Sequence, residues 1–194
     1  MNKNFFEVKN VDFNVGNKTK VKNVSFAIEN QGDVICLLGP SGIGKTTILR
    51  TIAGLEKIKK GSIILNGKTL SSEEINLEPE DRNISLAFQD NSLFPHYTVE
   101  KNILLGSERN KEKKDKKISL DEIVELLDIS KILSKYPHEI SAGEAQRTSL
   151  ARSLIMQPDL LLLDEPLSNV DQSFKEEIQV RLKKILNKLK ITTI

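Results

Sequence analysis

Two patterns of hydrophobic positions along this chain predict strands of two kinds. Segments 5–15 and 20–28 alternate apolar and polar residues, so they predict a peripheral antiparallel sheet with one solvated face. Residues 62–65, followed by Asn66-Gly67, predict a strand and a type I′ hairpin turn. Three short runs are instead continuously apolar, as in strands that a parallel sheet buries on both faces: VICLL (34–38), ISLAF (84–88) and LLLLD (160–164).

Helical patterns occupy the rest of the chain and predict an α/β fold. Residues 46–53 predict a helix closed by Gly54, which follows the run at 34–38 in a strand–loop–helix unit. Residues 91–157 show helical patterns without buried strands, including a capping box at Ser119-Leu-Asp-Glu122. The apolar stripe of a long C-terminal helix is formed by Phe174, Ile178, Leu182, Ile185 and Leu189.

Composition narrows the class of protein. A chain of 194 residues suits one domain, and its net charge of +2 gives no electrostatic case for binding nucleic acid. The single cysteine, Cys36, excludes a disulfide framework and is expected to be a small buried hydrophobe in a reducing cytosol. No apolar run approaches the roughly 20 residues of a membrane span, and no signal peptide is evident. We therefore expect a soluble protein that reaches a membrane only through a partner.

A phosphate-binding loop is predicted at GPSGIGKTT (39–47), which matches G-x-x-x-x-G-K-[ST] between a predicted strand and a predicted helix. Its glycines let the main chain curl so that amide N–H groups point at an anion, and the helix N-terminus adds partial positive charge. Lys45 is expected to reach the β- and γ-phosphates of ATP, and the Thr46 hydroxyl to bind Mg²⁺. The residues expected to bind ATP are Gly39, Pro40, Ser41, Gly42, Ile43, Gly44, Lys45, Thr46 and Thr47.

A pair of carboxylates at the end of the run at 160–164 supplies the chemistry of hydrolysis. Asp164 can hold Mg²⁺ through water, and Glu165 can polarise a water for in-line attack on the γ-phosphate. Such a pair can also simply cap the following turn, where Pro166 breaks the chain. The phosphate-binding loop favours the catalytic interpretation.

With these motifs the chain resembles the ATP-binding cassette (ABC) family over essentially its whole length. ISAGEAQR (140–147) is similar to the family signature, commonly LSGGQ followed by QR. The resemblance implies a P-loop NTPase (RecA-like) fold with a mostly parallel core sheet, an antiparallel β subdomain and an inserted α-helical subdomain. It also implies that residues 1–194 form a single cassette domain. Residues 1–90 and 158–194 would form the nucleotide-binding core with its β subdomain, and residues 91–157 would form the helical signature subdomain.

In this family two cassettes pair head to tail, and the signature of one closes over ATP held by the other. The resemblance therefore implies that Ser141 and Gly143, with Glu144 beside them, bind ATP in trans. Ala142 stands for a usual glycine, and Glu144 for a usual glutamine, which puts a carboxylate near phosphate. Because Ser141-x-x-Glu144 is also a capping box, this carboxylate is expected to turn back onto its own helix. Despite these two departures, we expect the signature still to close over ATP held by the other cassette, with unchanged or weaker binding.

Other positions take roles from the resemblance alone. Gln89 matches the Q-loop glutamine, which contacts Mg²⁺ and the attacking water. Asp171, in SNVD, matches the D-loop and is expected at the dimer seam or as a helix cap. Val15 occupies the place of the family's adenine-stacking aromatic residue, and Phe13 lies two residues back on the same strand face. Base stacking is therefore expected to be weak, with affinity resting on the phosphates.

Segment SLFPHYTVEKNILLG (92–106) resembles the part of importer cassettes that docks a permease, so 89–106 is the expected contact. With KYPHEISAGE (135–144) it is most similar to the ferric-iron, polyamine and sulfate import subfamily. The resemblance implies an ATPase subunit at the cytoplasmic face of the membrane that powers uptake of ferric iron or a similar solute. Its implied partners are a second copy, the permease and, indirectly, an extracytoplasmic substrate-binding protein. His96 and His138 are expected to be structural or interface residues, not metal ligands.

Two other functions stay open: a soluble cassette of the DNA-repair or translation-factor kind, and a truncated cassette that binds ATP with little hydrolysis. The resemblance implies a switch histidine directly after ITTI (191–194), yet no histidine follows His138. A fragment, a degenerate cassette and an erroneous reading frame are the three explanations. Without that histidine and the closing strands, 191–194 is expected at an exposed sheet edge, and ATP binding is expected to outlast hydrolysis.

Overall fold

A computed structural model describes residues 4–15, 19–88, 92–108 and 118–194 of this chain, and its strands form two sheets. One sheet is antiparallel, with the order β2-β1-β3-β4, and the other has the order β5-β6-β7 and is parallel. The strands are β1 (Phe6–Val15), β2 (Thr19–Ile28), β3 (Ser62–Leu65), β4 (Lys68–Ser71), β5 (Ile84–Ala87), β6 (Leu160–Leu163) and β7 (Thr192–Thr193).

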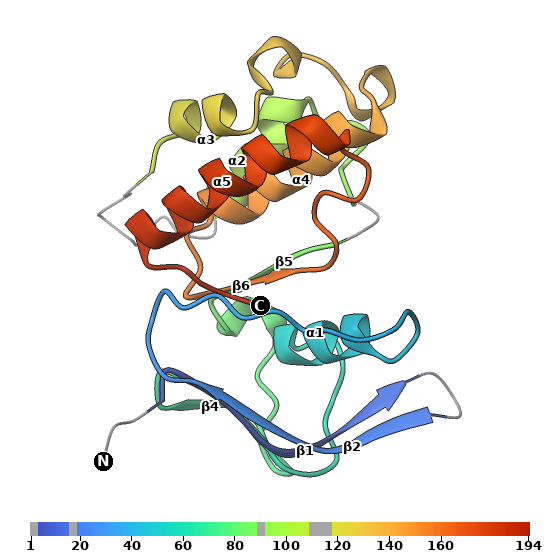
Figure 1. Ribbon diagram of the computed structural model, residues 1–194, viewed down its shortest axis with the longest axis vertical. Coiled ribbons are helices and arrows are strands. Elements are labelled where there is room, and N and C mark those ends of the chain that lie inside the picture. Colours follow the sequence, from blue (N-terminus) through green and yellow to red (C-terminus); the bar gives the residue numbers. More distant parts are fainter. Residues whose placement is uncertain (1–3, 16–18, 89–91, 109–117) are drawn as a thin grey trace.

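The helices lie on both sides of the parallel sheet. In Figure 1, α2 to α5 gather on one side of β5 and β6, and α1 lies on the other side, between these strands and the antiparallel sheet. No helix among the described residues combines the length and the apolar composition needed to cross a bilayer. The helices are α1 (Lys45–Ala53), α2 (Val99–Glu108), α3 (Leu120–Leu126), α4 (Ala142–Ile155) and α5 (Gln172–Leu189), with 3₁₀ turns at Pro79–Asp81, Ser130–Ile132 and Pro137–Glu139.

Strand β6 shows how the parallel sheet is buried on both faces. Leu161 packs into a hydrophobic cluster formed mainly by α2 to α5, whereas Leu160 and Leu162 pack into a second cluster formed by α1 and the antiparallel sheet. Because neighbouring residues of a strand point to opposite faces, a continuously apolar sequence is what such a strand requires. The prediction for 84–88 and 160–164 is therefore confirmed.

Several local predictions are confirmed as well. The turn between β3 and β4 has positive φ at Asn66 (47°) and Gly67 (76°), as a type I′ hairpin requires. Helix α1 ends at Gly54 in the left-handed conformation, with φ of 92°. The apolar stripe of α5 packs into the helical cluster, with Ile178, Leu182 and Leu189 buried and Phe174 and Ile185 partly buried. Residues 109–117, the charged sequence RNKEKKDKK, lie outside the described residues.

The apolar run at 34–38 is not a buried strand, so that prediction is wrong. Val34 forms one isolated parallel bridge with Thr193 and is 53% exposed, and Leu38 is 88% exposed. Cys36, expected to be buried, is also exposed. The reason is that β7 is the only neighbouring strand that the described residues provide for this segment. The expectation of an exposed edge at 191–194 is wrong too. Strand β7 lies between β6 and the segment 34–38, and it is buried.

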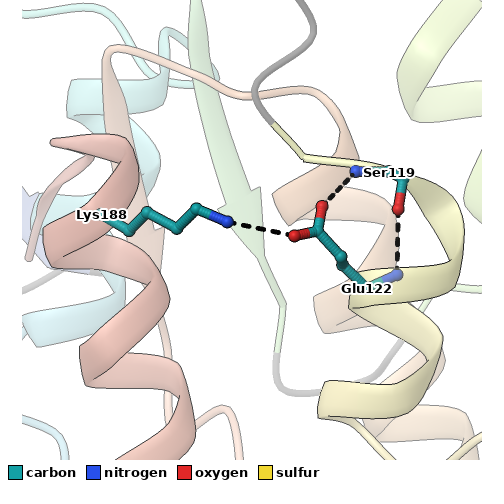
Figure 2. A network of polar contacts seen from close by, with 3 residues as sticks. All are labelled: Ser119, Glu122 and Lys188. Atoms are coloured by element: carbon teal, nitrogen blue, oxygen red, sulfur yellow. Dashed lines mark hydrogen bonds and ion pairs between the residues drawn. The ribbon is translucent and has the colours of Figure 1, made fainter.

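Helix α3 begins with the predicted capping box, which Figure 2 shows. The Glu122 amide donates to Ser119 Oγ at 3.1 Å, and Glu122 Oε2 accepts from the Ser119 amide at 2.9 Å. The other carboxylate oxygen accepts from Lys188 Nζ of α5 at 3.1 Å, so one side chain links the two helices. The Ser119 amide, followed by Lys188, holds the pKa of the Glu122 carboxyl below its usual value.

Candidate functional site

The phosphate-binding loop curls directly into α1. Gly42 has a φ of 80° and Gly44 a φ of 106°, both in the left-handed region that other residues adopt only with strain. A Cβ added at Gly42 would meet no atom within 4 Å, so this part of the loop borders open space. Gly44 is the N-cap of α1 and offers no side-chain acceptor, so the first amide N–H groups of the helix can bind an anion.

Lys45 places a full positive charge beside these amide groups. Its Nζ donates to the carbonyl oxygens of Gly39 at 2.8 Å and Pro40 at 3.0 Å, which holds the ammonium against the loop. A positive side chain, a curled main chain and a helix N-terminus together make an anion site. The other predicted ATP-binding residues lie on the same loop or in the first turn of α1, with Pro40, Ser41, Ile43 and Thr46 exposed and Thr47 half-buried.

The carboxylate pair lies at the carboxyl end of β6. The Asp164 side chain is buried, and its amide donates to the Ala87 carbonyl of β5 at 3.2 Å. Glu165 is exposed and has a φ of 49°, an unusual conformation for a residue with a side chain. One cleft of about 560 Å³ is lined by Lys45, Asp164 and Glu165. The fold therefore brings together two motifs that lie far apart in the sequence.

The Asp164 carboxylate in this cleft and the Thr46 hydroxyl in the first turn of α1 fit a magnesium ion that arrives with a nucleotide. Among the described residues, no three His, Cys, Asp or Glu side chains lie close enough to hold a metal ion by themselves. Mg²⁺ in phosphoryl-transfer sites is typically held by one or two carboxylates together with substrate phosphates and water. Asp164 and the Thr46 hydroxyl would supply the protein ligands. Gln89, the third predicted ligand, lies outside the described residues.

The signature begins α4, and its predicted capping box is confirmed. Ser141 Oγ accepts from the Glu144 amide at 3.2 Å, and Glu144 Oε2 accepts from the Ser141 amide at 2.7 Å. The Ser141 amide is the main reason that the pKa of the Glu144 carboxyl is lowered, with smaller contributions from Lys135 and Arg147 against the opposing effect of burial. The carboxylate is therefore turned onto its own helix, as expected.

We expect Glu144→Gln to reduce the loss of stability in acid. A carboxyl whose pKa is lower in the fold than its unfolded value, about 4.3, stabilises the fold above that value. This stabilisation is lost as the pH falls through the folded pKa, so the free energy of unfolding of the parent chain decreases in acid. The amide oxygen of Glu144→Gln still accepts from Ser141 but does not titrate.

Denaturant unfolding at pH 7 and pH 3.5 measures this difference, with Glu144→Ala as the control that loses the acceptor at both pH values. Loss of a capping interaction costs about 0.5–2 kcal/mol, which sets the expected decrease for the control at pH 7. An equal acid-induced decrease in the parent and in Glu144→Gln would contradict the assignment.

The structure contradicts two predicted roles near the site, adenine stacking by Phe13 and helix capping by Asp171. Phe13 is 1% exposed and belongs to the cluster under the antiparallel sheet, so it presents no ring face to an adenine. The reason is that the face of β1 that carries Phe13 packs on the core. The side chain of Val15, the other predicted stacking residue, lies outside the described residues. Asp171 is the N-cap residue of α5, but its side chain makes no capping hydrogen bond. Its role as a helix cap is therefore wrong, and its place at a dimer seam stays a prediction.

Comparison with known proteins identifies the family. Residues 21–168, most of the chain, match the family described as ABC transporter. The chain belongs to the ABC transporter family. The Fe(3+) ions import ATP-binding protein FbpC of Fusobacterium nucleatum is 40% identical over 189 residues, which are 97% of this chain and 50% of that protein. The sulfate/thiosulfate import ATP-binding protein CysA of Synechococcus elongatus is 39% identical over 97% of this chain and 54% of that protein.

The fold agrees with this assignment. A dimeric structure of the ATP-binding cassette MJ0796 in a post-hydrolysis state, bound to ADP and Pi, superposes with a TM-score of 0.78 at 25% identity. The match covers 97% of this chain and 85% of that one. The predicted ABC resemblance and the P-loop NTPase fold are therefore confirmed. The chain spans about half the length of the curated relatives it matches.

A second cleft of this ABC chain, of about 690 Å³, lies between the core and the helices. It is lined by residues that include Leu55 beyond α1, Leu86 of β5 and Leu105 of α2. Phe94 also lines it and is 45% exposed. The Arg152 guanidinium lies 5.9 Å from the centre of that ring.

Buried Asn102 binds the main chain of the segment beside this cleft through hydrogen bonds. Its Oδ1 accepts from the Phe94 amide at 2.8 Å, and its Nδ2 donates to the carbonyl oxygens of Phe94 and Tyr97, each at 3.1 Å. The centres of the His96 and Tyr97 rings lie 4.3 Å apart, so this histidine belongs to an aromatic group. In the described part of the segment predicted to dock a permease, Phe94 and His96 are therefore exposed beside a main chain that Asn102 holds by hydrogen bonds.

Two buried polar residues were missed by the sequence analysis. Arg82 donates to the carbonyl oxygens of Thr51 (3.4 Å) and Ile52 (3.0 Å) at the end of α1, and to Leu77 on the approach to β5. Burial lowers the pKa of Arg82, and Glu78 opposes this with a smaller effect. Gln146 was part of the signature segment but received no role. Neither residue belongs to a periodic pattern; their proximity to a recognised motif was the only available signal.

Proposed function

We propose that this ABC chain binds and hydrolyses Mg-ATP and thereby powers a membrane import permease. The observation that carries the proposal is the cleft lined by Lys45, Asp164 and Glu165. Lys45 and the amides of residues 39–47 bind the phosphates, while Asp164, Thr46 and Gln89 hold Mg²⁺. Glu165 and Gln89 orient and polarise the attacking water. Catalysis is then mostly positioning and charge stabilisation, as expected for phosphoryl transfer.

The working unit is proposed to be a head-to-tail homodimer. Ser141, Gly143 and Glu144 of one copy cover ATP held by the other, and Asp171 lies at the seam. Ser141 is exposed at the N-terminus of α4, where a helix offers amides to an anion. The proposed division into a core (1–90 and 158–194) and a helical part (91–157) is supported by the packing of α2 and α3 on α4.

Import is the proposed direction of transport, with ferric iron or a similar small ion as the cargo. The names of the relatives support this, since FbpC is an Fe(3+) import protein and CysA a sulfate/thiosulfate import protein. The permease docks at 89–106, beside the second cleft, and an extracytoplasmic substrate-binding protein takes part indirectly. The chain would then act at the cytoplasmic face of the membrane, as a peripheral subunit.

Reconstitution with the permease that co-purifies with this chain tests the function. We expect vesicles that contain both proteins to take up ferric iron with hydrolysis of ATP, and the permease to stimulate the hydrolysis. Uptake of sulfate or putrescine instead of ferric iron would support the proposed ATPase activity and identify a different transported solute. Mg-ATP binding without hydrolysis in the presence of the permease would overturn the proposed activity.

We expect Phe94→Asp to weaken the complex with the permease by about 30-fold, since an aromatic residue at the centre of an interface is often worth 2 kcal/mol or more. A charge placed there would also have to lose its hydration on docking. Val180→Asp on α5 is the control, because Val180 is an equally apolar residue, 57% exposed and outside the second cleft. Co-purification measures the effect, and equal retention of both variants would contradict docking at Phe94.

A further inference from the structure

The first turn of α4 lies directly against the turn that follows β6. The two backbones approach closely at Gly143, where an added Cβ would come within 2.9 Å of the Asn169 carbonyl oxygen. A side chain at this position would have to push the two backbones apart, so glycine permits the contact. Within one copy of the chain, the signature therefore touches the segment 165–169, which begins with Glu165.

Gln146 strengthens this contact with three hydrogen bonds. Its side chain is 2% exposed, and Nε2 donates to the Glu165 carbonyl at 3.0 Å and to Ser168 Oγ at 3.1 Å. Its Oε1 accepts from the Asn169 amide at 3.0 Å. All three bonds end on the segment 165–169. A buried amide that is satisfied in this way fixes the distance and the orientation between α4 and that segment.

The bond to the Glu165 carbonyl matters most, because Glu165 has a left-handed backbone with a φ of 49°. A residue with a side chain keeps this conformation only where surrounding contacts hold it. Two donors converge on its carbonyl oxygen: the Gln146 amide group and, at 3.2 Å, the Ser168 backbone N–H. Since the direction of the Glu165 side chain follows from its backbone, these bonds help to set where the carboxylate lies.

We infer that Gln146 is a positioning residue that ties the signature end of α4 to the main chain of Glu165. The inference rests on the proposed function, in which Ser141 closes over ATP bound by the other copy. A shift of the first turn of α4 on closure is then carried to Glu165 through Gln146 and the contact between Gly143 and Asn169. Gln146 itself touches no nucleotide. Hydrolysis by one copy thereby depends on its closure over the nucleotide of its partner.

Gln146→Glu tests the role of the donated hydrogen bond. An ionised carboxylate cannot donate to the Glu165 carbonyl, whereas a protonated one can. Burial beside hydrogen-bond acceptors raises the pKa of the introduced carboxyl, so the donor returns as the pH falls. We expect kcat at pH 8 to fall about 10- to 100-fold, the range expected for leaving a buried polar group unsatisfied. The ratio of variant to parent kcat should rise several-fold between pH 8 and pH 6.

Gln146→Met is the second variant, because it keeps the length of the side chain and removes every hydrogen bond. We expect it to lower kcat at all pH values without recovery in acid. The matched control is Thr148→Val, which removes a hydrogen bond made by another buried residue of the same helix, from the Thr148 hydroxyl to the Glu144 carbonyl at 2.8 Å. Both Gln146 variants should retain Mg-ATP dissociation constants within about twofold of the parent, because no phosphate contact is lost.

Amide hydrogen exchange gives a readout that does not depend on turnover. We expect faster exchange at residues 165–170 in Gln146→Met than in the parent or in Thr148→Val. A parent kcat in both Gln146 variants, or unchanged exchange in this segment, would overturn the inference. An equal loss of nucleotide affinity and kcat, with no recovery in acid, would also overturn it by indicating general damage. Absence of hydrolysis in the parent with its permease would instead count against the proposed function, and the exchange experiment would still decide the role of Gln146.

Discussion

Lys45→Ala is expected to lower the affinity for Mg-ATP by about 100-fold or more, since hydrogen bonds to charged groups contribute about 1.5–3 kcal/mol each. The side chain is held at the loop by the carbonyl oxygens of Gly39 and Pro40, so its charge already lies where a phosphate would bind. Its removal leaves the amides of α1 as the remaining attraction for the anion. Titration calorimetry of the parent and the variant measures the change.

Lys57→Ala is the matched control, because Lys57 is an exposed lysine just beyond the end of α1 and outside the cleft. It removes the same charge from the protein and should leave the affinity within about twofold, as expected for a surface charge beyond the contact. If Lys45→Ala and Lys57→Ala bound Mg-ATP equally well, the phosphate site would have to be sought elsewhere.

Glu165→Gln should separate nucleotide binding from hydrolysis. Loss of a general base commonly slows a reaction by about 10²- to 10⁴-fold, and we expect release of phosphate to fall within this range. The variant keeps the length of the side chain, and Lys45, Thr46 and Asp164 remain to hold Mg-ATP. The ATP-bound dimer should therefore accumulate. Steady-state phosphate release and sedimentation in the presence of Mg-ATP measure the two effects.

Glu177→Gln on α5 controls for the loss of one carboxylate, since Glu177 is exposed and pairs with Arg181 on the surface of the helix. It should hydrolyse ATP at the parent rate. Turnover by Glu165→Gln at that same rate would assign the polarisation of water to a different group.

The runs at 34–38 and 160–164 show what hydrophobic pattern can and cannot predict. Both are continuously apolar, yet only the second is a strand buried on both faces. Strand β6 has a neighbour on each side, whereas the other run has β7 alone among the described residues. An apolar side chain favours burial, but a strand is buried only where other elements of the fold cover it. Which elements pack beside a strand depends on the whole fold and cannot be predicted from five residues.

Some parts of the candidate site could likewise be predicted from the sequence, and others could not. The phosphate-binding loop and the capping boxes at Ser119 and Ser141 were predictable, because each is made by residues within a few positions of one another. Phe13 was placed wrongly because its strand position did not reveal which face of β1 packs on the core. Gln146 was missed because its partners lie about twenty residues away and two of them are main-chain groups.

The sequence by itself determined the local elements of this protein: the curl of residues 39–44, the end of α1, the starts of α3 and α4, and the carboxylate pair at the end of β6. These follow from backbone preference and from short-range hydrogen bonds, which act wherever the residues occur. Only the tertiary structure decided that Lys45 and Glu165 share a cleft, that Phe13 is buried and that Gln146 holds the Glu165 carbonyl. The physical reason is that long-range contacts depend on how sheets and helices pack, and many sequences with the same local patterns could pack differently.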